Sequence, residues 1–171
     1  MITLAKDLKR SERNKMLSDV RGVYFEQDDD LFAYYVFCYY SSVVTLRTAL
    51  SIYGIIDEWN NPPFDLVFQT GYRKLNSNNV NQYREKKELL YIGAIKLKYG
   101  RIEYNIYDLE RLLIEVFRKQ KYLSTDIYKQ AIFYYRNLVN EGKFNIPKFQ
   151  QYLSNFPKAK KYKTKFSLEV L

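Results

Sequence analysis

The chain contains no histidine and a single cysteine, Cys38. Histidine is the commonest general base and the commonest metal ligand in proteins, so its absence removes both, and a Cys/His zinc site cannot be built. One cysteine allows no intramolecular disulfide, which is typical of a protein from a reducing compartment such as the cytoplasm. Because no histidine can activate the thiol, we expect Cys38 to be buried and inert. We expect neither a metal ion nor a cofactor.

A long apolar run is also missing. The nearest approach to one is residues 31–46, LFAYYVFCYYSSVVTL, which are uncharged but are followed by Arg47. A membrane-spanning helix needs about 20 predominantly apolar residues, so two buried helices in succession explain this stretch better. The first residues, MITLAKDLKRSERNK, lack the apolar core of a signal peptide. The sequence therefore predicts a cytoplasmic protein with no membrane partner.

Apolar and positively charged residues are abundant. Hydrophobic residues make up 47% of the 171 positions, which is enough to form a buried core. The formal net charge is +9, and such a balance favours polyanions such as nucleic acid, or an acidic protein surface. Two plainer interpretations stay open. The charge can serve solubility alone, and the abundance of Lys, Asn, Ile and Tyr can reflect an AT-rich genome.

The N-terminal segment is dense in charge and carries a thin apolar stripe at roughly helical spacing. The stripe consists of Leu4, Leu8, Leu17 and Val20. It predicts a helix over residues 1–20, after which Gly22 breaks the pattern and VYFEQ at 23–27 predicts a short strand. This order is typical of the end of a winged helix-turn-helix, but a complete one needs about three helices and a wing. We therefore interpret residues 1–27 as a truncated winged-helix-like module.

Two helices are expected next. DDD at 28–30 supplies an N-cap and first-turn acids for a helix through Tyr40. A second helix is expected over residues 43–53, with Gly54 well placed as its C′ residue. Arg47 lies on the opposite face from the apolar residues of this second helix, where it is a candidate contact.

A strand-rich region follows the turn NNPP. The alternation in FDLVFQ predicts a strand over residues 64–69, whereas the polar residues 71–87 predict a loop or a poorly ordered helix. Residues 89–107, LLYIGAIKLKYGRIEYNIY, predict strands, because apolar and polar residues alternate on both sides of Tyr99-Gly100. This pattern indicates a hairpin with one apolar face.

Helices are expected to complete the chain. Their predicted N-terminal residues are Asp108, Ser124 or Thr125, Asn145, and Pro157 at the N1 position. Together with the expected strands, they predict an α+β fold. After the winged-helix remnant, residues 28–171 form an α/β domain with a small, mostly antiparallel sheet and a C-terminal helical bundle.

The charges of YDLERLLIEVFRK at 107–119 could form a reacting site, a helix cap or a recognition surface. As an N-cap, Asp108 accepts hydrogen bonds from the first backbone N–H groups, and the helix dipole favours Glu110. Helical positions i and i+2 diverge by about 200°, which argues against paired catalytic carboxylates. Arg111 lies outside the apolar stripe, where a surface ion pair with Glu115 and a role in recognition both stay open. We expect a binding protein rather than an enzyme.

Four short segments stand out by their order and spacing. They are TALSIYGI at 48–55, YDLERLLIEVFRK at 107–119, AIFYY at 131–135 and SLEVL at 167–171. Together they resemble the AbiEi-type antitoxins of bacterial abortive-infection systems. The residues that match the motifs are Thr48, Ala49, Leu50, Gly54, Tyr107, Asp108, Glu110, Arg111, Ala131 and Tyr135. Two positions depart from the pattern, because Leu112 replaces a frequent Thr and Glu115 replaces an Asp.

The resemblance implies a function and its partners. Such an antitoxin is encoded beside a nucleotidyltransferase-like toxin, and its winged helix-turn-helix binds operator DNA and represses the operon. The chain is therefore expected to neutralise such a toxin and to regulate its own operon. The alternative is a basic nucleic-acid-binding transcriptional regulator without a toxin partner. The candidate contacts for nucleic acid or a partner are Lys9, Arg10, Arg13, Arg47, Arg101, Arg111, Arg118, Lys158, Lys160 and Lys161.

Overall fold

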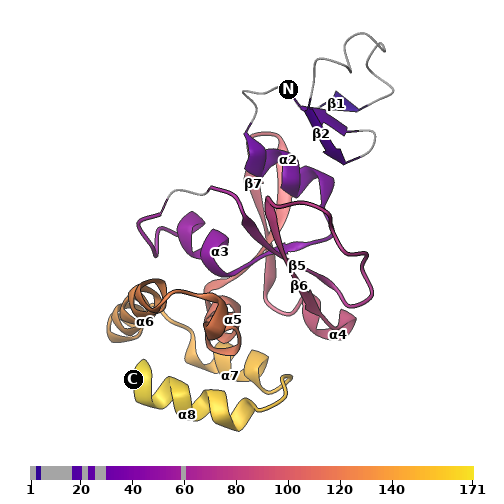
Figure 1. Cartoon of the computed structure of the whole chain (residues 1–171). Helices are drawn as coiled ribbons and strands as arrows, with labels where there is room; N and C mark the ends of the chain where they lie inside the picture. Colours follow the sequence, from indigo (N-terminus) through magenta and orange to yellow (C-terminus); the bar gives the residue numbers. More distant parts are fainter. Residues whose placement is uncertain (1–2, 5–16, 21–22, 26–29, 59–60) are drawn as a thin grey trace.

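The computed structural model describes residues 3–4, 17–20, 23–25, 30–58 and 61–171 of the chain (Figure 1). Its class is α+β, as the sequence predicts, and all of its strands precede residue 108. The N-terminal strands are β1 (Thr3–Leu4), β2 (Leu17–Val20) and β3 (Val23–Phe25). They form an antiparallel sheet in the order β1-β3-β2.

A five-stranded sheet lies at the centre of the remaining chain. Its middle strand, β4 (Val43–Val44), pairs antiparallel with β5 (Phe64–Gln69) and parallel with β8 (Ile102–Tyr107). At one edge β6 (Val80–Glu85) runs parallel to β5, and at the other β7 (Ala94–Tyr99) runs antiparallel to β8. The sequence predicts a mostly antiparallel sheet, and this sheet has two antiparallel and two parallel pairs.

Local sequence signals explain the sheet and the helix that covers it. The residues from Phe64 to Phe68 are all buried, which accounts for the apolar run of β5. The β7–β8 hairpin closes through the pair Tyr99↔Ile102, as predicted. Helix α2 (Leu31–Cys38) begins at its predicted N-cap, Asp30, whose carboxylate accepts bonds from two backbone N–H groups. The helix packs on β8 through the edge-to-face contact of Phe32 and Tyr104, whose ring centres are 5.2 Å apart.

From residue 109 onward the chain is helical. This part contains α5 (Leu109–Arg118), the 3-10 turn η2 (Gln120–Tyr122), α6 (Thr125–Asn140), α7 (Ile146–Leu153) and α8 (Ala159–Glu169).

 Figure 1 shows these helices gathered at the end of the sheet away from β1 and β2. Helix α5 is the central one, because it contacts α6, α7 and α8 as well as α3 (Leu46–Ile52) and β8.

The N-terminal helix is the first prediction that the structure contradicts. Thr3–Leu4 and Leu17–Val20, both placed in the helix over 1–20, are strands, whereas the short strand after Gly22 is confirmed at Val23–Phe25. A thin stripe of apolar residues is a weak helix signal, and pairing with β3 overrides it. The other residues of the 1–27 module lie outside the described part of the chain, so its winged-helix character stays a prediction.

Four local predictions are wrong further along the chain. Val43–Val44 form β4 rather than the start of a helix, because β-branched side chains suit the buried centre of a sheet. Residues 80–85 form β6 rather than a loop or helix, since an edge strand tolerates polar side chains. Leu89 and Leu90 belong to helix α4 (Lys87–Leu90) and not to a strand. Pro157 precedes α8 instead of occupying N1, because Lys158 takes a left-handed backbone with φ 64°.

The apolar stretch 31–46 is divided among α2, β4 and the start of α3. Across the described ranges, no helix has both the length and the apolar character needed to cross a membrane. Cys38, the last residue of α2, is half-buried rather than buried as predicted.

Candidate functional site

The junction between β8 and α5 is built on Asp108. This residue has an extended backbone (φ −65°, ψ 171°), and its Oδ1 accepts a hydrogen bond from the backbone N–H of Arg111 at 2.9 Å. Its Oδ2 accepts a hydrogen bond from the hydroxyl of Tyr152 at 3.0 Å. Asp108 is therefore the N-cap of α5, as predicted, and it also ties the start of this helix to α7.

Asp108 and Glu110 share one cation, Lys148 of α7. The Nζ atom of Lys148 lies 2.9 Å from Oδ2 of Asp108 and 3.1 Å from Oε2 of Glu110. The predicted divergence of the two carboxylates is wrong, because Asp108 is extended rather than helical. Burial lowers the pKa of Lys148, but the hydrogen bonds to both carboxylates outweigh burial and raise it above its ordinary value. Lys148 therefore stays protonated and bridges α5 to α7.

Arg111 is completely buried, with 0% of its surface exposed. Its Cζ atom lies 4.4 Å from the ring centre of Tyr107 and 4.1 Å from that of Phe156, so the guanidinium contacts both aromatic faces. Its Nη2 atom lies 3.0 Å from Oε1 of Glu115. The expected ion pair of Arg111 with Glu115 is confirmed, but its expected place on the surface is wrong, because both side chains are buried.

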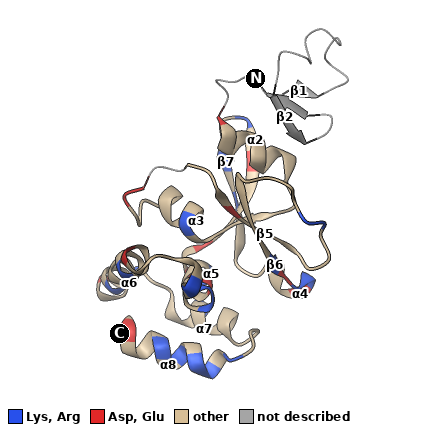
Figure 2. Cartoon of the chain, viewed as in Figure 1, with Lys and Arg blue, Asp and Glu red and all other residues tan. Residues whose placement is uncertain are grey.

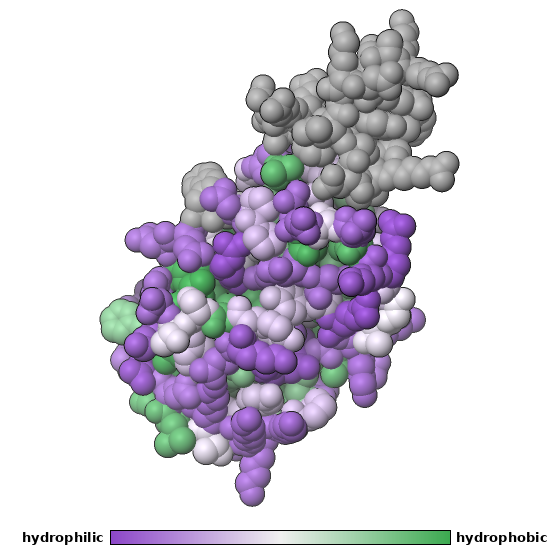
Figure 3. Space-filling model, in the orientation of Figure 1, coloured by the Kyte–Doolittle hydropathy of each residue, from purple (hydrophilic) through white to green (hydrophobic). Residues whose placement is uncertain are grey.

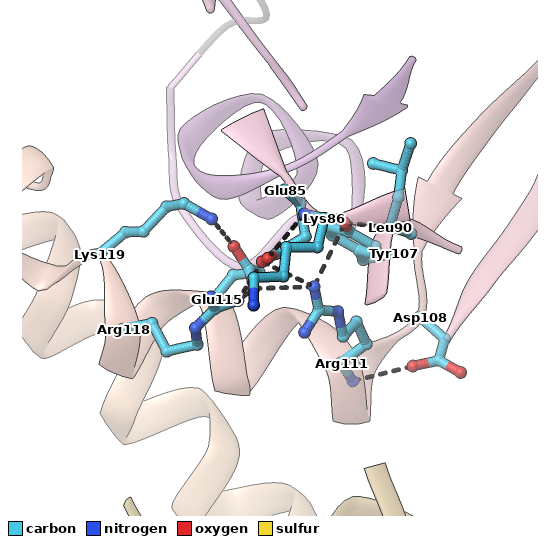
Figure 4. Close-up of polar contacts among 9 residues, drawn as sticks. All are labelled: Glu85, Lys86, Leu90, Tyr107, Asp108, Arg111, Glu115, Arg118 and Lys119. Atoms are coloured by element: carbon cyan, nitrogen blue, oxygen red, sulfur yellow. Dashed lines mark hydrogen bonds and ion pairs between the residues drawn. The ribbon is translucent and has the colours of Figure 1, made fainter. Parts of the chain in front are cut away.

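Arg111 belongs to a group of charged side chains that we call the buried ion cluster (Figure 4). The cluster consists of Glu85, Arg111, Glu115, Arg118 and Lys119. Glu115 is 0% exposed and accepts hydrogen bonds from Arg118, at 2.7 Å, and from Lys119. Arg118 also donates to Glu85 of β6 at 2.6 Å. The cluster thus fastens an edge strand of the sheet to α5.

The members of the cluster keep one another ionised. Burial by itself raises the pKa of Glu115. The positive charges of Lys119, Arg111 and Arg118 together outweigh burial and lower this pKa to about 2. Burial lowers the pKa of Arg118, and the two carboxylates raise it above its ordinary value. Within the described residues, Nε and Nη1 of Arg111 have no hydrogen-bond partner, whereas Nη2 contacts Glu115 and donates to the hydroxyl of Tyr107 at 3.3 Å.

Gly93 allows the chain to pass against the buried ion cluster. It has a φ of 71°, and a Cβ atom added there would lie 2.4 Å from Cβ of Arg111 and 2.9 Å from Cε2 of Tyr152. Its carbonyl accepts a hydrogen bond from the backbone N–H of Asp108 at 2.8 Å. The sequence reasoning missed this residue. An isolated glycine beside a strand is the signal that could have indicated a close backbone approach.

The other candidate contacts do not form one site. Arg47 is half-buried and its guanidinium binds Glu58, at 3.4 Å, and the carbonyls of two loop residues. Arg118 lies in the buried ion cluster, and Arg101 is exposed beside the β7–β8 turn. The exposed candidates on and beside α8 are Lys158, Lys160 and Lys161. Lys9, Arg10 and Arg13 lie outside the described residues.

The segments that carry the family resemblance meet in the interior. The hydroxyl of Tyr53, in TALSIYGI, donates to the carbonyl of Tyr107 at 2.9 Å. The hydroxyl of Tyr135, in AIFYY, donates to the carbonyl of Leu109 at 2.9 Å. Gly54 follows α3 with a φ of 66°, as expected of a C′ residue. Three segments distant in sequence are therefore joined around the start of α5.

The site has no arrangement typical of a metal centre. In the parts of the chain that the structure describes, no three Asp, Glu or Cys side chains converge as metal ligands would. A scan against models of known protein families gives no match, and a search of curated proteins gives none either. The family resemblance therefore depends on the motifs alone.

Proposed function

We propose that the chain is an antitoxin-like protein that acts by binding and neutralises a nucleotidyltransferase-like toxin in the cytoplasm. One observation carries the proposal. The segments 48–55, 107–119 and 131–135 resemble AbiEi-type antitoxins, and hydrogen bonds from Tyr53 and Tyr135 join them. These contacts place the matching residues together around the start of α5.

The charged groups at the start of α5 favour binding over chemistry. A general acid–base pair needs side chains that are free to reach the substrate within hydrogen-bond distance. Asp108 and Glu110 instead share the protonated Lys148, and Asp108 is also occupied as a helix cap. Turnover of a nucleotide or nucleic acid that is lost in Asp108→Asn or Glu110→Gln would contradict a binding function.

Co-expression tests the antitoxin function directly. We expect the chain to restore growth of cells that express the nucleotidyltransferase-like protein encoded beside it, measured as plating efficiency. Tyr53→Phe and Tyr135→Phe each remove a hydrogen bond that joins the motif segments, at a cost of about 1 kcal/mol. Both variants should therefore still rescue growth. Failure of the wild-type chain to rescue, although soluble and abundant, would contradict the proposal.

We propose operator binding as a second function, and the lysines around the start of α8 support it. Figure 2 shows how much of α8 carries positive charge. Lys158, Lys160, Lys161 and Lys163 are exposed, and none of them forms an ion pair with a described residue. Unpaired, solvated lysines are suited to neutralising phosphates. The same surface serves the alternative function of a nucleic-acid-binding regulator without a toxin.

The salt dependence of DNA binding tests this second function. Replacing the four lysines by Gln should lower the slope of log K against log salt by about 3–4, since each phosphate contact contributes about 0.9. The measurement is a fluorescence-anisotropy titration with promoter DNA at several salt concentrations. A control with the same charge change replaces the exposed Lys74, Lys86, Lys87 and Lys98. An equal change in the control would show that net charge alone, and not the α8 surface, governs binding.

A further inference from the structure

The described residues of the face drawn in Figure 3 are mainly hydrophilic, and the apolar ones lie singly or in small groups. On a polar surface, a ligand is selected best by a hollow that combines an aromatic ring with polar groups. Such a hollow, of about 360 Å³, lies at the carboxyl end of β5, and we call it the β5 hollow. Its lining includes Ser41, Gln69, Thr70, Tyr72, Leu90 and Tyr91. The carboxyl ends of parallel strands such as β5 and β6 are a common place for ligands.

Two tyrosine rings line the β5 hollow. Tyr91 is 50% exposed, and its hydroxyl donates a hydrogen bond to the carbonyl of Ser41 at 2.8 Å. Tyr72 is half-buried and packs on Phe68, with the two ring centres 4.7 Å apart. Both rings are fixed by contacts with the protein, so an aromatic surface is in place before a ligand binds.

Three polar side chains accompany the rings. They belong to Ser41, Gln69 and Thr70, which are exposed and form no side-chain hydrogen bond with another described residue. Two hydroxyls and an amide offer both donors and acceptors. The edge of a nucleobase presents the same two kinds of group, and its face stacks on aromatic side chains.

Positive charge predominates near the β5 hollow, although none of the residues that line it is charged. Arg84 of β6 is exposed, and its Nη2 atom donates to the carbonyl of Tyr72 at 3.2 Å. The exposed residues at the start of α4, whose last residue lines the hollow, are Lys86, Lys87 and Glu88. Figure 2 shows this positive charge at α4. Three cations against one carboxylate favour an anionic ligand such as a phosphate ester.

The combination of rings, polar side chains and cations favours a nucleotide over other ligands. A neutral carbohydrate stacks on tyrosine but makes no use of the charge of Arg84. A phosphate ion uses the charge but not the rings. Double-stranded nucleic acid fits less well, because its bases are paired and stacked on one another and leave no face for Tyr91.

We propose that the β5 hollow binds a nucleotide unit, with its base stacked on Tyr91 and its phosphate near Arg84. Gln69 and Thr70 bind the edge of the base. The unit is a free nucleotide or an unpaired nucleotide of a single strand, since both present the same base and phosphate. This inference goes beyond antitoxin activity and operator binding and depends on neither, so growth rescue and this binding can fail separately.

Binding of defined probes to the purified chain tests the proposal. The probes are the 5′-monophosphates of adenosine, guanosine, cytidine and uridine, followed by calorimetry, and a short fluorescein-labelled single strand of mixed sequence, followed by anisotropy. Tyr91→Ala should weaken binding about 5- to 150-fold, the usual contribution of stacking one base on an aromatic ring. Tyr91→Phe keeps the ring and should bind nearly as tightly as the wild-type chain. Tyr122→Ala is the control, because Tyr122 is similarly exposed, at 56%, but lies outside the hollow.

The contact with phosphate has its own test. Arg84→Gln should lower the slope of log K against log salt for the single strand by about 0.7, the value for one phosphate contact. Arg101→Gln makes the same charge change at an exposed residue outside the hollow and should leave the slope unchanged. Circular dichroism of each variant checks that it is folded.

The probes also separate the sources of the ligand. Tyr91-dependent binding of the monophosphates alone assigns the β5 hollow to free nucleotides, and Tyr91-dependent binding of the strand assigns it to unpaired nucleotides. Either result supports the proposal. Ribose 5-phosphate that binds as tightly as the monophosphates overturns it, because this probe has no base. A blunt duplex that competes as well as the single strand, unchanged binding by Tyr91→Ala, or no binding by the wild-type chain at millimolar concentrations overturns it too.

Discussion

Glu115→Gln is expected to lower the free energy of unfolding by about 3–5 kcal/mol, the usual cost of breaking a buried ion pair. Glu115 is 0% exposed and lies against Arg111, Arg118 and Lys119. Removing its charge leaves Arg111, which is also 0% exposed, with Glu85 as its remaining carboxylate at 3.8 Å. Urea unfolding followed by circular dichroism measures the loss.

The pH dependence of this loss provides a second measurement. The pKa of Glu115 in the folded chain, about 2, lies below its ordinary value of 4.5. The ionised form therefore favours folding, and this contribution is complete above about pH 4.5 and is lost as the pH falls toward 2. The difference in unfolding free energy between the wild-type chain and Glu115→Gln should narrow over that range.

Glu103→Gln is the matched control for Glu115→Gln. Glu103 forms an ion pair with Lys96 at 2.7 Å, but both side chains are largely exposed. Exposed pairs are screened by water and salt, so this variant should unfold close to the wild-type urea midpoint. Equal losses of unfolding free energy in the two variants would show that the buried ion cluster stabilises the fold no more than an exposed ion pair does.

Elements with a local signal could be predicted from the sequence. The β7–β8 hairpin follows from alternation on both sides of Tyr99-Gly100, and the structure confirms it. Helices α5, α6 and α7 begin at their predicted caps, Asp108, Ser124 and Asn145, because capping is a contact within one turn of the chain.

The buried ion cluster could not be predicted, because its signal is not local. The apolar stripe of α5 indicates one buried face, and Arg111 lies off that stripe. In the structure α5 contacts both the sheet and the other helices, so its polar side is buried as well. The residues that complete this side are distant in sequence. Glu85 comes from a segment predicted to be a loop or a poorly ordered helix, and Phe156 follows α7.

Burial of Arg111 also changes the meaning of the motif that it belongs to. In YDLERLLIEVFRK, the charges suggested a surface for recognition or a reacting site. The structure assigns Asp108 and Glu110 to Lys148, and Arg111 and Glu115 to each other. The motif therefore specifies how α5 is held in the fold. Contacts with a partner must come from other surfaces, which is why operator binding is proposed at the exposed lysines around the start of α8.

Gly93→Ala is expected to lower the free energy of unfolding by about 2–5 kcal/mol. A left-handed backbone costs a residue with a side chain about 1–2 kcal/mol, and overpacking a filled interior adds about 1–3 kcal/mol. Both apply at Gly93, whose φ is 71° and whose added Cβ would lie 2.4 Å from Cβ of Arg111. That neighbour is held between two rings and Glu115, so it has little freedom to move aside.

Gly142→Ala separates the two causes. Gly142 has nearly the same backbone, with a φ of 67°, but nothing lies within 4 Å of an added Cβ atom. Gly142→Ala should be destabilised only by the backbone contribution. The difference in unfolding free energy between the two variants therefore measures the cost of the contact with Arg111. Urea unfolding of both variants gives that difference. Equal losses would mean that the interior around Arg111 can relax, and the tight approach of Gly93 to α5 would then be wrong.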